Sequence, residues 1–188
     1  MPLNERLDRY RRMRSFDSPA GTWELLQRKE VFHRTKRIYF DEVENANVWS
    51  FYLVERDLHH TFEEFVISLD LPPYAIWSKQ GTNAIKDARV TFPISETAAV
   101  FKDPVPTAGM TIEYVLEVLH VGKSSAVIGF LGFVHGESGA YAKTPSVVAA
   151  WLRVLVEYNA NGTRSVIPLP DEFKARLEKY VPRDPIWT

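Results

Sequence analysis

The sequence predicts an α+β domain in which an antiparallel sheet wraps around one long helix. Apolar residues recur at spacings of three, four and seven between Val48 and Leu69, which is typical of an amphipathic helix. The second half of the chain instead contains several runs rich in β-branched and aromatic residues, which favour strands. A helix with one apolar stripe, followed by a meander of strands, packs most economically against one face of their sheet.

Length and composition fit a single globular domain. The chain has 188 residues, of which 45% are hydrophobic, and 23 Lys and Arg against 24 Asp and Glu leave a formal net charge of −1. The absence of cysteine excludes a thiol nucleophile, thiolate metal sites and disulfides. The first residues lack the apolar core of a signal peptide, and no run is long enough to span a membrane, so we expect a cytoplasmic protein.

Charged residues are unevenly distributed along the chain. Residues 1–37 hold ten basic and five acidic side chains, a balance of +5, so the remainder carries −6. A basic segment can contact nucleic acid. However, apolar residues at Leu3, Leu7, Tyr10 and Met13 indicate an amphipathic helix with a solvated arginine face, and we expect no nucleic-acid partner. We therefore divide the chain into an N-terminal helical extension, a main domain and a C-terminal tail, which are residues 1–30, 31–180 and 181–188.

The elements follow in order along the main domain. Val31–Phe40 favours a strand, the polar segment 41–47 leads into the long helix, and Pro72 and Pro73 end that helix. The nearly continuous apolar run Ala126–Phe133 indicates a sheet that is partly buried on both faces. The other expected elements are four strands and a short C-terminal helix, which are Phe92–Phe101, Met110–Val121, Ser124–Val134, Val147–Tyr158 and Pro170–Tyr180.

Glu55 is the first candidate for a catalytic group. It lies on the apolar stripe of the helix, between Phe51 and Leu58, and by helical rotation falls near the middle of that face. Burial there would raise the pKa of its carboxyl, which suits a general acid or base. The alternative is a structural glutamate that bonds a core group or reaches a subunit interface.

Glu44 is the second candidate, because it lies just ahead of the helix N-terminus. Unpaired backbone N–H groups at that end favour anions, and they could also polarise an ester or thioester carbonyl. A carboxylate beside such donors makes a compact site for acyl transfer. The alternative is that Glu44 only complements the helix dipole together with Asp41 and Glu42.

The remaining motifs are weaker. Lys123, Ser124 and Ser125 lie at an expected hairpin and could hold a phosphate, although a lone turn lysine is usually only solvated. His59 and His60 fit helical pairs with polar or solvated neighbours, and one helix supplies too few ligands for a metal site. We expect no metal, and the sequence contains no dinucleotide-binding fingerprint.

The order of these motifs resembles the 4-hydroxybenzoyl-CoA thioesterase family of hotdog proteins. That family usually carries a strand, then Asp-x-x-Gly-[Val/Ile], then the central helix, and Arg37–Val48 is similar to this loop. The resemblance covers about residues 31–180. Its other matching segments are the helix end at Leu71-Pro72-Pro73, the strands and hairpin from Phe92-Pro93-Ile94 through Val121–Ser125, and the tail Ile167–Phe173.

The resemblance implies hydrolysis of an acyl-CoA or acyl-carrier-protein thioester without a metal or organic cofactor, coenzyme A being part of the substrate. The resemblance assigns the loop carboxylate, which acts as nucleophile or general base, to Glu44. It assigns the backbone N–H that stabilises the oxyanion to a position near Phe51. The nucleotide end of CoA falls on Lys123, Ser124 and Ser125, and the family forms homodimers or homotetramers. Aromatic residues further suggest an apolar acyl pocket, and these are Trp49, Phe51, Tyr52, Trp77 and Phe101.

Two departures from the family pattern leave three readings open. Glu44 replaces the usual Asp, and Asn47 stands where Gly is usual. Either Glu44 has adapted, or Glu55 on the helix has taken over, or the protein binds acyl-CoA or a related ligand without hydrolysing it. A dehydratase ranks last, because Asp57 and His60 are outside the spacing that such enzymes use.

Overall fold

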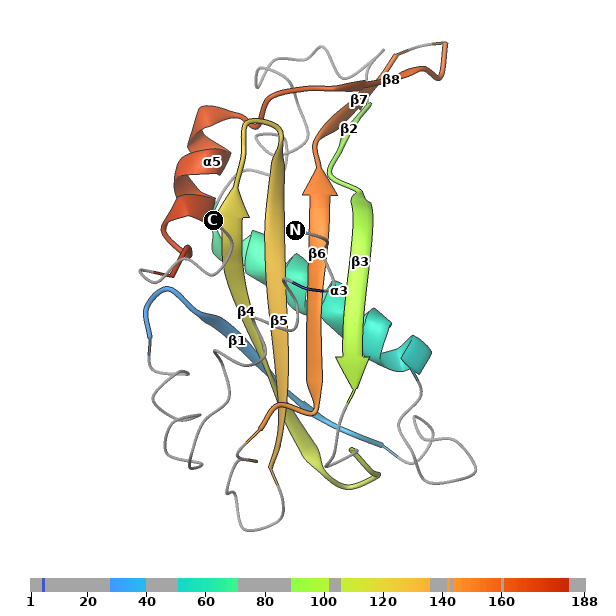
Figure 1. Cartoon of the computed structure of the whole chain (residues 1–188), viewed down its shortest axis with the longest axis vertical. Helices are drawn as coiled ribbons and strands as arrows, with labels where there is room; N and C mark the ends of the chain where they lie inside the picture. The colour runs from blue at the N-terminus through green and yellow to red at the C-terminus, as the bar shows by residue number, and fades with distance from the viewer. Residues whose placement is uncertain are drawn as a thin grey trace.

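A computed structural model describes residues 5, 28–39, 51–70, 89–101, 106–135, 142, 144–159 and 161–182, with the backbone alone for Phe51, Tyr52 and Arg89. Within these ranges, five strands form one antiparallel sheet in the order β1-β4-β5-β6-β3 (Figure 1). This confirms the antiparallel sheet of the predicted fold class. The strands are β1 Phe32–Arg37, β3 Ile94–Phe101, β4 Thr111–Val121, β5 Ser125–His135 and β6 Val147–Val154.

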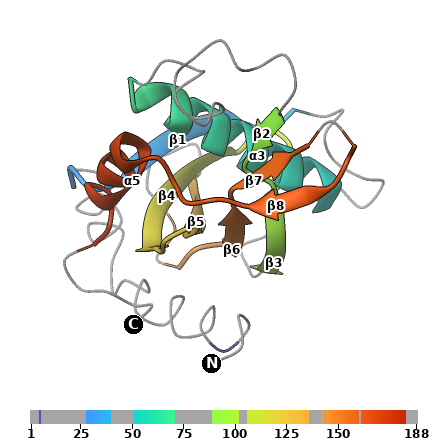
Figure 2. The same cartoon turned by 90° about the horizontal axis from the view of Figure 1, so that it is seen from above.

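Helix α3 (Phe51–Ser68) crosses one face of this sheet, and Figure 2 shows it from above, with the strands curving beneath it. Its apolar stripe meets the sheet in a continuous core, in which Leu58, Phe65 and Trp151 are fully buried. Aromatic rings in this core pack at an angle to one another, and the ring centroids of Phe130 and Trp151 are 4.6 Å apart. The helix therefore supplies most of one wall of the core.

A smaller sheet and a second helix complete one end of the domain. Strands β2 (Arg89–Thr91), β7 (Val156–Tyr158) and β8 (Arg164–Val166) pair antiparallel in the order β2-β7-β8. Helix α5 (Asp171–Glu178) has two acidic residues in its first turn, which favour its N-terminal dipole, and buries Phe173 in the main core. The expected C-terminal helix is thus present.

The opposite face of the sheet carries a second apolar cluster, which includes Val115, Leu131 and Phe133. These residues alternate along their strands with residues of the first core, as the period of two in a strand requires. The prediction of a sheet buried partly on both faces is confirmed.

Three predicted strands differ from the observed ones. The run Val31–Phe40 is shorter as β1, which begins at Phe32 and ends at Arg37. The run Val147–Tyr158 is divided at Leu155, so that β6 joins the large sheet and β7 joins the small one. The run Phe92–Phe101 begins two residues later as β3, since Phe92 and Pro93 lie between the end of β2 and the start of β3, and the ladder of β3 with β6 shifts register between Ile94 and Glu96. Strand β8 was not predicted.

Parts of the predicted organisation lie outside the described residues. These include most of the N-terminal extension and residues 183–188 of the tail, so the division into extension, domain and tail stays a prediction. In the described part of the chain, no helix combines the length and apolar character needed to cross a membrane.

Candidate functional site

The predicted catalytic loop before α3 lies outside the described residues, and Glu44 is part of it. Its role therefore stays a prediction. Phe51 is the first residue of α3, at the end of the helix where the oxyanion donor is expected, and the first turn contains no acidic residue. An anion bound there meets no competing carboxylate from that turn.

Glu55 lies at the border of the buried face of α3 and is half-buried. The face is centred on Val54, Leu58 and Phe65, so the expectation that Glu55 occupies its middle is wrong. The predicted apolar stripe included Val48 and Phe51. Counting these two residues rotated the predicted centre of the buried face toward Glu55. Burial nevertheless raises the pKa of the Glu55 carboxyl, with Arg153 acting in the opposite direction.

Asp57 is the fully buried carboxylate among the described residues of the helix, with only 1% of the residue exposed. Its Oδ2 accepts a hydrogen bond from Lys36 Nζ of β1 at 2.6 Å. About two turns further along the same flank, Glu64 Oε1 accepts a hydrogen bond from Arg34 Nε at 2.8 Å. These ion pairs join α3 to β1, and we assign Asp57 a structural role.

The opposite flank of α3 borders a pocket of about 660 Å³. It lies between the helix, the start of β3 and the end of β6, and its walls are mainly apolar. The residues that form it are His59, Phe62, Glu63, Val66, Ile67, Pro93, Ile94 and Arg153. A concave, largely apolar site with a few polar groups is the usual form of a small-molecule site.

Arg153 is the buried cation of this pocket, at 7% exposure. Its Nη1 donates a hydrogen bond to the carbonyl oxygen of Phe92 at 2.7 Å, and its guanidinium carbon lies 3.8 Å from the centroid of the Phe62 ring. Burial lowers the pKa of Arg153 to about 10, while Glu63 and Glu55 act to raise it. The side chain therefore stays charged at neutral pH.

His59 lines the pocket beside Arg153. Its ring centroid is 4.7 Å from that of Trp151, and the residue is half-buried. Burial, followed by the nearby Arg153, lowers the pKa of His59 from 6.5, so the imidazole is neutral at pH 7. His59 has polar neighbours, as its helical spacing predicted, since Glu63 and Arg153 interact with it, and its ring also packs against Trp151 of the sheet.

Glu55, His59 and Glu63 are four residues apart in sequence and so lie on successive turns of one flank of α3. Both carboxylates interact electrostatically with Arg153. The structure thus brings Glu55 together with His59 and Arg153, two residues that the sequence reasoning did not select. One signal for Arg153 was visible, since it is the single charged residue between Val147 and Leu155 in an otherwise apolar run.

Lys123, Ser124 and Ser125 form the β4–β5 hairpin, as expected, and Lys123 is exposed. The carbonyl oxygens of Lys123 and Ser124 accept hydrogen bonds from the backbone N–H groups of Leu169 and Leu155 at 2.9 and 2.8 Å. Ser125 pairs with Val154 in the ladder, next to Arg153, so hairpin and pocket share one end of the sheet. Binding of a phosphate by these residues stays a prediction.

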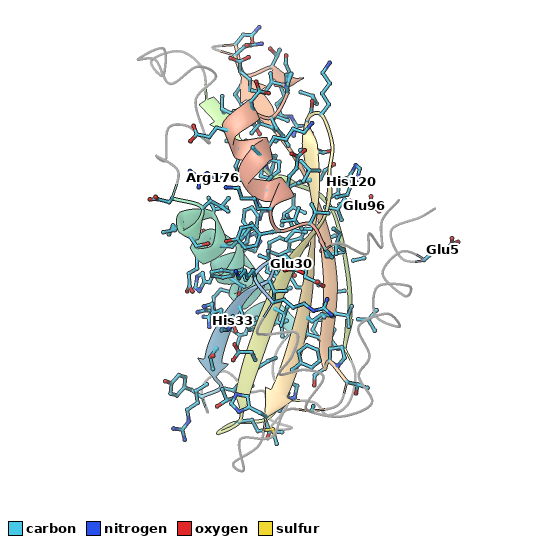
Figure 3. The ribbon with its side chains drawn as sticks, turned by 90° about the vertical axis from the view of Figure 1, so that its left-hand side faces the viewer. Glu5, Glu30, His33, Glu96, His120 and Arg176 are labelled. Atoms are coloured by element: carbon cyan, nitrogen blue, oxygen red, sulfur yellow. The ribbon has the colours of Figure 1, made fainter. Side chains whose placement is uncertain are left out.

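The other titratable groups lie elsewhere. His33 Nδ1 is 2.7 Å from Glu113 Oε1, and the other carboxylate oxygen, Oε2, accepts a hydrogen bond from the Thr35 hydroxyl, on the sheet face opposite α3. Figure 3 shows His33 on β1 and His120 toward the hairpin end of β4, at different heights on the sheet. Across the residues that the structure describes, no group of three or more His, Asp or Glu side chains could hold a metal ion.

No family model and no curated protein matches the chain. Solved structures do match. The 4-hydroxybenzoyl-CoA thioesterase from a Pseudomonas species is 17% identical, with 78% of this chain and 98% of that one covered at a TM-score of 0.62. The dynemicin thioesterase is 14% identical, with 81% and 98% covered at a TM-score of 0.62.

This chain has the hotdog fold. A thioesterase-like protein from Prochlorococcus marinus has a similar fold. It is 21% identical, and the match covers 79% of this chain and 95% of that one at a TM-score of 0.60. The resemblance to the 4-hydroxybenzoyl-CoA thioesterase family that the sequence suggested is thereby supported at the level of fold. Within the hotdog fold of this chain, the described pocket lies on the β6 flank of α3.

Proposed function

We propose that the protein hydrolyses an acyl thioester of coenzyme A or of an acyl carrier protein. The observation that carries this proposal is the largely apolar pocket along α3, which has a half-buried carboxyl of raised pKa, Glu55, beside it. An acyl group fits such walls, and thioester hydrolysis needs a carboxylate and backbone donors but no cofactor. Several solved hotdog proteins of similar fold are thioesterases.

In the proposed reaction the thioester carbonyl lies at the N-terminal end of α3. The Phe51 N–H donates a hydrogen bond to the carbonyl oxygen and stabilises the negative charge that develops there. Glu44 removes a proton from water, and the hydroxide oxygen adds to the carbonyl carbon. The carbon–sulfur bond then breaks, and the thiolate takes up the proton from Glu44. Direct attack by Glu44, followed by hydrolysis of the anhydride, gives the same products.

A second assignment of the base is favoured by a specific observation. The raised pKa of Glu55 suits general acid and base chemistry, and its position is one helical turn from Phe51. In this version Glu55 takes the proton from water, and Glu44 supports the helix dipole. Both versions use the same acyl pocket and the same oxyanion donor.

Two variants separate these assignments. Glu44→Gln and Glu55→Gln each keep the shape of the side chain and remove its proton-accepting carboxylate. We expect Glu44→Gln to lower kcat for acyl-CoA hydrolysis by about a hundredfold or more, the usual contribution of a general base. If Glu44→Gln retains wild-type kcat and Glu55→Gln loses it, the helix carboxylate is the base.

A non-catalytic acyl-CoA-binding protein is the alternative function. A hotdog protein of Staphylococcus aureus, 14% identical, was solved in complex with CoA, and the fold accommodates this ligand there. Binding of acyl-CoA without release of thiol, across aryl, short and long acyl groups, would establish that alternative.

We further propose that the active form is a homodimer or homotetramer. Strand β3 lies at one edge of the five-stranded sheet, next to the pocket, and Phe101 at its end is 40% exposed. Phe101 is not among the described residues of this pocket, and the other aromatic residues of the expected acyl pocket lie outside the described residues or have undescribed side chains, so that pocket stays a prediction. Light scattering of the purified chain measures the assembly directly, and a monomeric mass would exclude it.

A further inference from the structure

We propose that the pocket on the β6 flank of α3 holds the far part of a medium-length acyl chain, and that Arg153 selects chains carrying an uncharged oxygen, a hydroxyl or a ketone, at that depth. The position of the thioester at the start of α3 rests on the proposed function. The chemistry of the pocket itself rests on its own residues.

The flank of α3 sets the chain length. Glu55, His59, Phe62 and Val66 follow Phe51 on one side of the helix, at steps of three or four residues. His59 is eight residues beyond Phe51, which is about 12 Å along the helix axis. An acyl chain that starts at the Phe51 N–H and follows this flank therefore reaches the pocket only if it is of medium length. Acetyl and other short acyl groups stop before it.

The pocket offers the chain apolar walls and a few polar groups, of which Arg153 is the buried one. Phe62, Val66 and Ile94 contribute the apolar surface. Arg153 is more than nine-tenths buried, and its Nε has no hydrogen-bond partner among the described residues. The indole Nε1 of Trp151, whose ring lies 4.9 Å from the guanidinium, is a second buried nitrogen without a partner there. Buried N–H donors without an acceptor are costly, so an oxygen that accepts from them gains affinity.

Charge around Arg153 decides which oxygen is accepted. Glu55 and Glu63 of α3 both interact with the guanidinium, and Nη1 is already bonded to the Phe92 carbonyl. His59, on the turn between the two glutamates, is neutral at pH 7. A carboxylate on the ligand would be a third negative charge, beside those of Glu55 and Glu63, around the single positive charge of Arg153. A hydroxyl or ketone oxygen gains the hydrogen bond without that repulsion.

Calorimetric binding to the full chain tests this selection. The probes are thioether analogues of CoA, which cannot be hydrolysed, carrying a decyl, an ω-hydroxydecyl or an ω-carboxynonyl chain. We expect the hydroxyl to tighten binding about tenfold relative to the plain chain, as a hydrogen bond to a charged donor does, and the carboxylate to give no gain. Because no turnover is needed, this result is independent of whether the protein hydrolyses thioesters, which a separate thiol-release assay measures.

Two substitutions assign the effect to Arg153. R153M keeps an unbranched stem against Phe62 and removes every N–H, and R153K keeps the charge but removes Nε–H. Both variants, once circular dichroism shows them folded, should bring the hydroxyl-to-plain affinity ratio to about one. R164M removes an exposed arginine of β8 and should keep the wild-type ratio.

Three results would overturn the proposal. They are equal binding of the plain and hydroxylated chains by the wild type, an unchanged preference in R153K, and tighter binding of the carboxylated chain than of the hydroxylated one. The last result would make the pocket an anion site.

Discussion

The guanidinium carbon of Arg153 lies 3.8 Å from the centroid of the Phe62 ring, so the end of β6 and the fourth turn of α3 are in direct contact. Both residues line the pocket, so this contact places a buried charge beside its mainly apolar wall. On the other flank of α3, the Lys36–Asp57 pair fixes the helix to β1. One flank of the helix is thus tied to the sheet, and the other is open to a ligand.

Filling the pocket should weaken binding of long acyl groups. Val66→Phe adds a ring to the pocket wall, and we expect it to raise KM for decanoyl-CoA about tenfold, and more than it raises KM for acetyl-CoA, because only the longer chain reaches Val66. The matched substitution Val166→Phe, on exposed β8, should leave both values as in the wild type. Equal effects of Val66→Phe on the two substrates would place the acyl chain elsewhere.

Removing the buried carboxylate of α3 should destabilise the fold. Asp57→Ala leaves Lys36 without the carboxylate 2.6 Å away, and we expect a loss of about 3–5 kcal/mol in the free energy of unfolding, measured by urea denaturation. The double variant Lys36→Met with Asp57→Leu should recover most of it. Glu178→Ala breaks an exposed pair with Lys174 and should cost less than about 1 kcal/mol. Similar costs for the buried and exposed pairs would refute this assignment.

Acid should weaken the fold through His59. The pKa of His59 is lowered in the folded state from its ordinary value of 6.5. Below pH 6.5 the unfolded chain therefore binds a proton at His59 more readily than the folded chain does. The free energy of unfolding should therefore fall as the pH drops below 6.5. His59→Gln should reduce that slope, and the matched variant His120→Gln, at an exposed position on β4, should keep it. An identical slope in all three proteins would argue against a desolvated His59.

A methyl group at Gly132 should disrupt the packing of β5. A Cβ there would lie 2.9 Å from Ile112 Cδ1 and 3.0 Å from Val147 Cβ, both in the core between neighbouring strands. We expect Gly132→Ala to cost about 1–3 kcal/mol in urea unfolding. Gly109→Asn is a suitable comparison, because that position has φ +86° and open space, and asparagine tolerates this conformation. A neutral Gly132→Ala would mean that the strands separate more easily than the contacts indicate.

The sequence predicts the sheet well because β4 and β5 are long runs of β-branched and other apolar residues, and their hairpin is short. It predicts the rotation of α3 less well. A single helix pattern leaves its centre uncertain by one residue, and this error moved Glu55 from the border of the buried face to its middle. The sequence alone also cannot pair Lys36 with Asp57 or place Arg153 over Phe62, since these contacts join residues on different elements. The family resemblance supplied the roles of Glu44 and Phe51, which composition and spacing did not establish.

Release of free thiol from a series of acyl-CoA thioesters, with acetyl, benzoyl, decanoyl and ω-hydroxydecanoyl groups, tests the central claim most directly. The account predicts hydrolysis by the wild type, with kcat/KM highest for the ω-hydroxydecanoyl thioester and lower for acetyl-CoA, and loss of turnover when the catalytic carboxylate is replaced. Tight binding of these thioesters with no thiol released from any of them would contradict it.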